Sequence, residues 1–166
     1  MTNFTKFALA PSLALAALIP LATPAIAGSD DIVVTSQSEM DAWQKGATMR
    51  LNRVLARNPA ERSATPGSGI VQVTFTLDED GRPANIALHG STAGRVAEQS
   101  AIYAVRRMGD LSDVPVANAK DAQFIANIVF ANDRAERRDL FAELAQSEQT
   151  RLASGSSEAQ FIALGG

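Results

Sequence analysis

The chain has 166 residues, 46% of them hydrophobic and 20% charged, which is sufficient for one folded domain with its own core. It contains no cysteine, and this excludes disulfide bonds, thiol catalysis and thiolate metal sites. A formal net charge of −3 argues against a general nucleic-acid-binding protein, because such proteins present clustered basic residues to the phosphates.

Residues 1–27 have the pattern of a secretory signal peptide. Lys6 is the only charged residue among them, an apolar stretch follows it, and Ala25-Ile26-Ala27 supplies the small-residue cleavage pattern. We therefore predict export and cleavage after Ala27. The exported chain, residues 28–166, then carries 14 basic and 18 acidic residues, a net charge of −4.

A retained membrane anchor is the alternative for the same segment. The 20 residues from Phe7 to Ile26 carry no charge, and a spanning helix needs about 20 predominantly apolar residues. The stretch is interrupted by Pro11, Pro20 and Pro24, which favour the cleavable interpretation.

Residues 28–69 are expected to form a short strand, a helix and a loop. Ile32–Thr35 is a β-prone run. In residues 39–58 apolar side chains recur at three- and four-residue spacing, which is the pattern of a helix with one buried face. Pro59 ends this helix, because the residue before a proline avoids the helical conformation.

Three arginines of this helix, Arg50, Arg53 and Arg57, share one face. Such a set is a candidate for binding an anionic surface in the cell envelope. More often it is only a solvated helix face, and both interpretations stay open.

The stretch 71–88 predicts a β-hairpin. Apolar and polar residues alternate before and after a turn at Asp78–Gly81, in which Gly81 supplies the left-handed conformation that closes a short loop. The acidic turn is not a calcium loop of the EF-hand type. That pattern needs a glutamate at its twelfth position, where this chain has Ala87.

A helix over residues 93–108 and a strand over 122–131 are expected next. The helix carries a stripe of small residues, which lets it lie close to a sheet. One face of the strand is apolar, and the other is mixed and consists of Gln123, Ile125, Asn127 and Val129. The mixed face predicts either a strand covered on both sides or a sticky surface.

The end of the chain is expected to add a helix over residues 132–153 with a narrow apolar stripe. The residues after it, 154–166, have the composition of a flexible tail with one apolar patch, Phe161–Leu164.

The sequence contains no recognisable catalytic or cofactor site. His89 is the only histidine, so a Ser-His-Asp triad would have to use it, and we interpret it as a solvent-facing strand residue. No glycine-rich phosphate loop occurs, and no acid, base and nucleophile come together. We therefore expect no catalytic residue, no metal and no cofactor.

The order helix, hairpin, helix, strand resembles the C-terminal domain of TonB, the energy transducer for outer-membrane receptors of Gram-negative bacteria. The resemblance covers residues 70–131. It is carried by the stretches GIVQVTFTLDEDGRPANIALHGST, AEQSAIYAVRRM and AQFIANIVF.

The resemblance implies an α+β fold. A three-stranded antiparallel sheet would have the order 2-1-3, with helices packed on one face, and residues 132–153 would be an extra C-terminal helix. In TonB the third strand is an edge that pairs with a short receptor segment. The resemblance therefore implies that Gln123, Ile125, Asn127 and Val129 contact a partner polypeptide.

The sequence departs from this family in its N-terminal part. TonB keeps an inner-membrane helix and a long proline-rich spacer, whereas here the leader looks cleavable and only residues 28–69 precede the hairpin. We therefore expect a non-enzymatic periplasmic protein that binds a protein or peptide of the envelope, such as an outer-membrane receptor. The alternatives are a transducer component anchored in the inner membrane and a self-associating structural protein, for example a homodimer.

Overall fold

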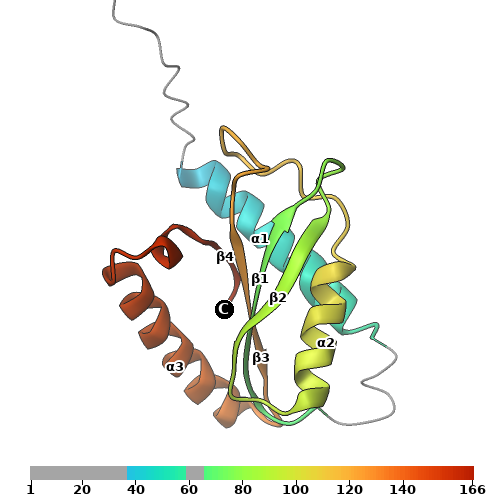
Figure 1. Ribbon diagram of the computed structural model, residues 1–166. Coiled ribbons are helices and arrows are strands. Elements are labelled where there is room, and N and C mark those ends of the chain that lie inside the picture. The colour runs from blue at the N-terminus through green and yellow to red at the C-terminus, as the bar shows by residue number, and fades with distance from the viewer. Residues whose placement is uncertain (1–36, 59–65) are drawn as a thin grey trace, which may run out of the picture. The chain divides into compact units, whose positions relative to one another are not determined.

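The computed structural model describes residues 37–58 and 66–166, which belong to one compact unit, Val33–Gly166. The predicted signal peptide and the β-prone run at residues 32–35 lie outside the described residues. The fold is α+β, as expected (Figure 1). Its elements are α1 (Gln37–Leu55), β1 (Gly69–Leu77), β2 (Pro83–Ser91), α2 (Arg95–Arg106), β3 (Phe124–Phe130), α3 (Arg134–Ala153), the 3₁₀ helix η2 (Ser157–Gln160) and β4 (Ile162–Gly165).

The sheet has four strands in the order β2-β1-β3-β4. β1 pairs antiparallel with β2 and with β3, which confirms the predicted order 2-1-3 of the first three strands. β4 pairs with β3 and runs parallel to it. The expectation of a three-stranded antiparallel sheet with β3 at its edge is therefore wrong, because the sheet is mixed and β3 has a strand on each side.

The additional strand comes from the segment expected to be a flexible tail. Residues Ser157–Gln160 form η2 and Ile162–Gly165 form β4. Serine and glycine give this segment a composition typical of flexible tails, but its apolar residues Ile162 and Leu164 pack into the main core. Leu164 has no exposed surface, and the burial of that side chain is one reason that the tail is ordered.

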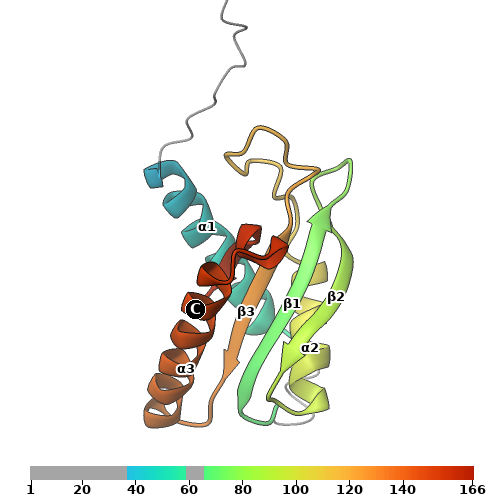
Figure 2. The same ribbon diagram turned by 60° about the vertical axis from the view of Figure 1, so that its left-hand side comes forward.

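Helices cover both faces of the sheet (Figure 2). α1 and α2 lie on one face, and α3 lies on the other, where it contacts β3 and β1. The expectation of helices on one face therefore describes α1 and α2. The extra helix α3 makes the fold three layers deep.

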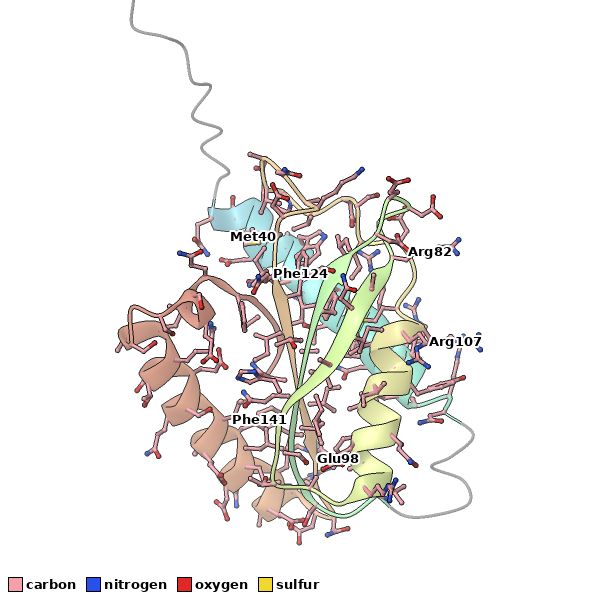
Figure 3. The ribbon with its side chains drawn as sticks, viewed as in Figure 1. Met40, Arg82, Glu98, Arg107, Phe124 and Phe141 are labelled. Carbon is pink, nitrogen blue, oxygen red and sulfur yellow. The ribbon has the colours of Figure 1, made fainter. Side chains whose placement is uncertain are left out.

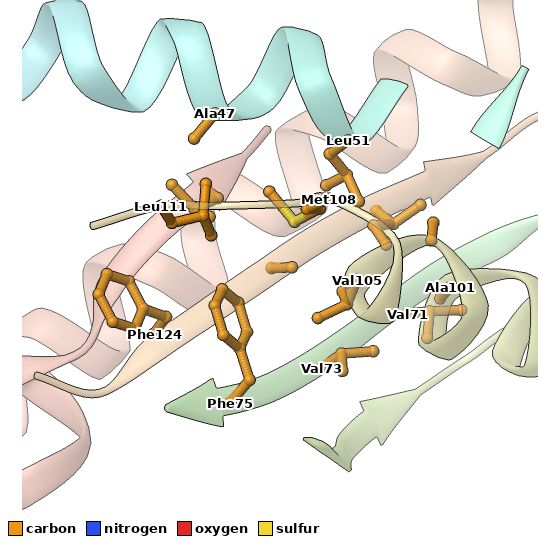
Figure 4. Packing of buried hydrophobic residues seen from close by; sticks show 14 of the residues in the cluster. Ala47, Leu51, Val71, Val73, Phe75, Ala101, Val105, Met108, Leu111 and Phe124 are labelled. Carbon is orange, nitrogen blue, oxygen red and sulfur yellow. The ribbon is translucent and has the colours of Figure 1, made fainter. Parts of the chain in front are cut away.

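The main core lies between the sheet and the pair α1 and α2 (Figure 4). It is centred on three aromatic rings, with Phe124 of β3 stacked on Phe75 of β1 at 5.1 Å and tilted against Trp43 of α1 at 5.8 Å. The small residues of α2, such as Ala101 and Ala104, are completely buried, and they let this helix lie close to the strands as the sequence predicts.

A smaller cluster lies on the second face, beneath α3. Its buried members are Ile70, Ile125, Asn127 and Leu144. Leu144 is the one buried residue of α3, so this helix packs against the sheet through a small contact. Of the two interpretations of the mixed β3 face, the structure therefore favours a strand covered on both sides.

Candidate functional site

The side of β3 that faces away from β1 is the place where a short strand adds to the sheet. β4 pairs there in the register Phe124 with Ile162 to Asn127 with Gly165. The backbone N–H of Ile162 donates a hydrogen bond to the carbonyl oxygen of Gln123, at 2.9 Å. β4 pairs with only the first part of β3, and Ile128–Phe130 have no strand neighbour on this side among the described residues.

Two side chains of α1 bind the outer edge of β4. Gln44 donates from Nε2 to the carbonyl oxygen of Ala163 at 3.1 Å, and Thr48 accepts at Oγ1 from the backbone N–H of Gly165 at 2.9 Å. Gln44 and Thr48 are four residues apart and therefore lie on one face of the helix. These side chains bind backbone groups of β4 that a further strand would otherwise pair with, and they therefore protect this edge from strand addition.

The side chains of β4 alternate between the two faces of the sheet. Leu164 is fully buried in the main core, and Ile162 packs against the same core. Ala163 points to the other face, where it lies near Leu144 of α3. Just before the strand, the ring of Phe161 lies nearly perpendicular to the ring of His89 on β2, with 6.2 Å between their centres.

Gly165 ends β4 at a position that requires glycine. Its φ of +80° is in the left-handed region, and a Cβ there would lie 2.1 Å from the carbonyl oxygen of Asn127. A side chain at residue 165 would therefore push β4 away from β3.

The four residues predicted to contact a partner share β3 and its approach but differ in exposure. Gln123 is exposed, Val129 is half-buried, and Ile125 has no exposed surface. Asn127 is 3% exposed, and its Oδ1 accepts a hydrogen bond from Nε2 of Gln72 at 2.9 Å. The structure therefore leaves Gln123 and Val129 as the two members that a partner can reach directly.

Two cavities border β4. One, of about 420 Å³, opens near its start and is lined by Met40, Gln123, Phe161 and Ile162, among others. The second, of about 160 Å³, lies between α3 and the strands, beside Asn127, Phe141 and Ala163. Figure 3 shows Phe141 on the side of α3 that faces the sheet. Unfilled space therefore remains beside β4 near its start, at Ile162, and near its end, at Gly165.

The opposite edge of the sheet is irregular. β2 pairs with β1 through a register that shifts twice, and Asn85 within it has a φ of +49°. Bulges of this kind twist an edge strand away from regular pairing. Leu88 on this strand is 42% exposed. The regular side of β3 is therefore better suited than β2 to accept a strand.

The predicted basic face is divided. Arg50 donates to the carbonyl oxygen of Asp110 at 2.6 Å and pairs with the carboxylate of Asp113 at 3.2 Å, so it fastens α1 to the loop after α2. Arg53 and Arg57 are exposed. The residues therefore do not act together as a free cluster of three.

The acidic turn and His89 keep the roles that the sequence predicts for them. Oδ1 of Asp78 accepts from the backbone N–H groups of Asp80 and Arg82 at 3.0 and 2.8 Å, which closes the hairpin turn. His89 is exposed on β2.

Within residues 37–58 and 66–166 no three metal-ligating side chains form a group, and no helix there has the length and apolar character to cross a membrane.

We compared the chain with models of protein families, with curated proteins and with solved structures, and found no match in any of the three.

Sequence reasoning missed the residues that define the β3 edge in the folded protein. The helix that holds Gln44 and Thr48 is predicted from the spacing of its apolar residues. That spacing does not indicate that a strand lies beside these two side chains. The available signal was the apolar patch at Phe161–Leu164 followed by two glycines, which is the composition of a short strand and its end.

Proposed function

We propose that this protein is a non-enzymatic, TonB-like protein of the periplasm that binds an extended partner polypeptide by strand pairing along β3. The observation that carries the proposal is that the outer side of β3 accepts a short parallel strand, β4. Strand addition takes its affinity from main-chain hydrogen bonds and its selectivity from the alternate side chains.

The residues around β3 support this function more than an enzymatic one. The site is made of backbone groups, amide side chains and apolar surface, and Gln123, Asn127 and Val129 belong to it. Among the described residues, the pKa is displaced at two carboxylates, and neither of them belongs to β3. Asp110 is in the loop after α2, where hydrogen bonds from Ser112 lower its pKa, and Glu136 is in the first turn of α3.

The partner that we propose is a segment of an outer-membrane receptor or of another envelope protein. To test this, the ¹⁵N-labelled chain is titrated with peptides from the N-terminal segments of such receptors while its backbone amide signals are recorded. We expect saturable shifts confined to β3, β4 and their neighbours. The absence of shifts at millimolar peptide would contradict the proposal.

Val129 provides the variant for this titration. It is half-buried and lies on the part of β3 that β4 does not cover, so Val129→Glu should weaken peptide binding at least several-fold without unfolding the domain. Leu152→Glu, on an exposed position of α3, is the matched control and should bind as the unmodified chain does. Ile125 is unsuitable for this purpose, because a charge at a fully buried position would destabilise the fold itself.

A further inference from the structure

The C-terminal half of α1 and the whole of α2 carry an excess of positive charge, although the net charge of the chain is −3. Residues 46–57 and 95–107 contain six arginines and a single acidic residue, Glu98. α3, on the other face of the sheet, is balanced by comparison, since its 20 residues contain four arginines and four acidic residues. The basic excess therefore lies on the side of the sheet that α1 and α2 cover.

The C-terminal parts of α1 and α2 meet at one place. Arg50 of α1 donates from Nη1 to the carbonyl oxygen of Asp110, four residues beyond the end of α2, at 2.6 Å. Leu51 and Met108, which are close to these two residues in the chain, pack in the same core (Figure 4). Side chains from the last turns of both helices are therefore brought to a common junction.

Four exposed arginines belong to this junction, and we call them the helix-end arginines: Arg53, Arg57, Arg106 and Arg107. The two on the α1 side follow Arg50 by three and seven residues, and the two on the α2 side precede Asp110 by four and three. The two ion pairs formed within residues 37–58 and 66–166 belong to Arg50 and Arg151. The helix-end arginines therefore have no carboxylate partner in the described part of the chain.

Each pair of helix-end arginines has an apolar or aromatic neighbour. Met49 is 55% exposed and lies one turn before Arg53 on the same face of α1. On α2 the guanidinium group of Arg107 lies over the ring of Tyr103, 5.5 Å from its centre, and Figure 3 shows Arg107 pointing away from the sheet. Arginine binds phosphate oxygens with paired hydrogen bonds, whereas apolar and aromatic side chains suit the boundary between lipid head groups and acyl chains.

We propose that the helix-end arginines dock this protein on an anionic phospholipid surface. The arginines bind the lipid phosphates while Met49 and Tyr103 approach the acyl boundary. None of the four lines either cavity beside β4, and they come from two helix ends and not from the walls of a groove, so a flat surface suits them better than a single peptide chain. This inference goes beyond the proposed function and does not depend on strand pairing along β3.

The test measures sedimentation of the full chain with lipid vesicles. The vesicles contain phosphatidylcholine alone or phosphatidylcholine with one third phosphatidylglycerol, which is anionic. Residues 1–27 have one charged side chain, so a retained leader would bind both kinds of vesicle alike, and the measured quantity is the ratio of the two affinities. We expect a preference of about a hundred-fold for the anionic vesicles, because each arginine near such a surface adds about five-fold. The preference should disappear at about 0.5 M salt, which screens the charges.

One arginine from each helix provides the variants. Arg53→Gln and Arg106→Gln should each lower the preference for anionic vesicles about five-fold, and the double variant should lower it at least ten-fold. Both positions are exposed and glutamine is a good helix former, so the fold should be kept. The matched control is the double variant Arg134→Gln and Arg138→Gln on α3, which changes the net charge equally and should lower the preference less than two-fold.

Three results would overturn the proposal. The first is equal binding to neutral and anionic vesicles, and the second is an equal loss in the double variant and its control. The third is a loss in only one of the single variants, since the two helices would then not share a surface. If the chain instead binds poly-glutamate and not the anionic vesicles, the occupant is an acidic polypeptide, and the assignment to lipid is overturned.

Discussion

Asp113 joins α1 to the loop that follows α2. Its Oδ1 accepts from the indole Nε1 of Trp43 at 3.0 Å, and its carboxylate pairs with Arg50 at 3.2 Å. Trp43 is 6% exposed, so its N–H has little access to water if this acceptor is lost. The pair with Arg50 is more exposed and contributes less.

We therefore predict that Asp113→Ala lowers the free energy of unfolding by about 1–2 kcal/mol, chiefly through the buried indole N–H. Asp113→Asn keeps an oxygen acceptor and should lose less than half as much. The measurement is urea denaturation followed by the fluorescence of Trp43, the one tryptophan in the chain. Asp139→Ala, at an exposed position on α3, is the control. An equal loss in both Asp113 variants would mean that the charge, and not the acceptor, carries the effect.

At the scale of the element, α3 is held at its N-terminus by hydrogen bonds with its own side chains. Asp133 is its N-cap and accepts at Oδ1 from the backbone N–H groups of Ala135 and Glu136 at 2.7 and 2.9 Å. Glu136 reaches back to accept from the backbone N–H of Asn132 at 2.7 Å. The arrangement resembles a capping box, except that Glu136 binds the residue before the N-cap, and with only Leu144 buried it supplies much of the local support of the helix.

We predict that α3 frays as the solution is acidified. Hydrogen bonds from the hydroxyl of Ser68 and from the backbone N–H of Asn132 hold the pKa of Glu136 below its ordinary value. A carboxyl group with a lowered pKa in the folded state stabilises it above the unfolded pKa, and this contribution is lost as the pH falls below about 4. Amide exchange of residues 135–137 against pH measures the effect.

Two variants separate the members of the box. Glu136→Gln should flatten the acid dependence of amide exchange in this turn while leaving the helix in place. Asp133→Ala should fray the first turn at every pH, with a loss of about 1 kcal/mol typical of a removed N-cap. An unchanged acid dependence in Glu136→Gln would show that another carboxylate titrates there.

The elements that could be predicted from the sequence are those whose side chains repeat with a clear period. β1, α2 and β3 fall within two residues of their expected limits, because alternation and three- to four-residue spacing reflect burial directly. β4 was missed because four residues are too few to display a period. The strand is stabilised by the burial of Leu164 in the core and by the pairing of Ile162 with β3, a strand nearly forty residues earlier in the chain.

The proposed binding edge was partly predicted in the same sense. Gln123, Ile125, Asn127 and Val129 do lie along β3, but the sequence could not indicate which of them α3 and β4 cover. Whether a strand is an edge depends on what the rest of the chain places beside it. This is a property of the folded molecule and not of the strand.

At the scale of the whole molecule, the question is whether β4 opens by itself or only when the domain unfolds. β1 is paired on both sides and lies at the centre of the sheet, whereas β4 is short and is held on its outer side by two side chains of α1. Elements with few buried contacts open at lower free energy than the core does. Leu164 opposes this opening, since its side chain is completely buried.

We predict that native-state hydrogen exchange separates these two classes of amide. Ile162 and Gly165 should exchange through a local opening with little dependence on denaturant, because little surface is exposed, whereas Val73 should exchange only with global unfolding. Thr48→Val removes the acceptor of the Gly165 N–H and should speed its exchange about five-fold, while Thr48→Ser should leave it unchanged. If Ile162 and Val73 exchange with the same free energy, a partner could reach the part of β3 that β4 covers only by unfolding the domain. Replacement of β4 would then be ruled out as the route of binding.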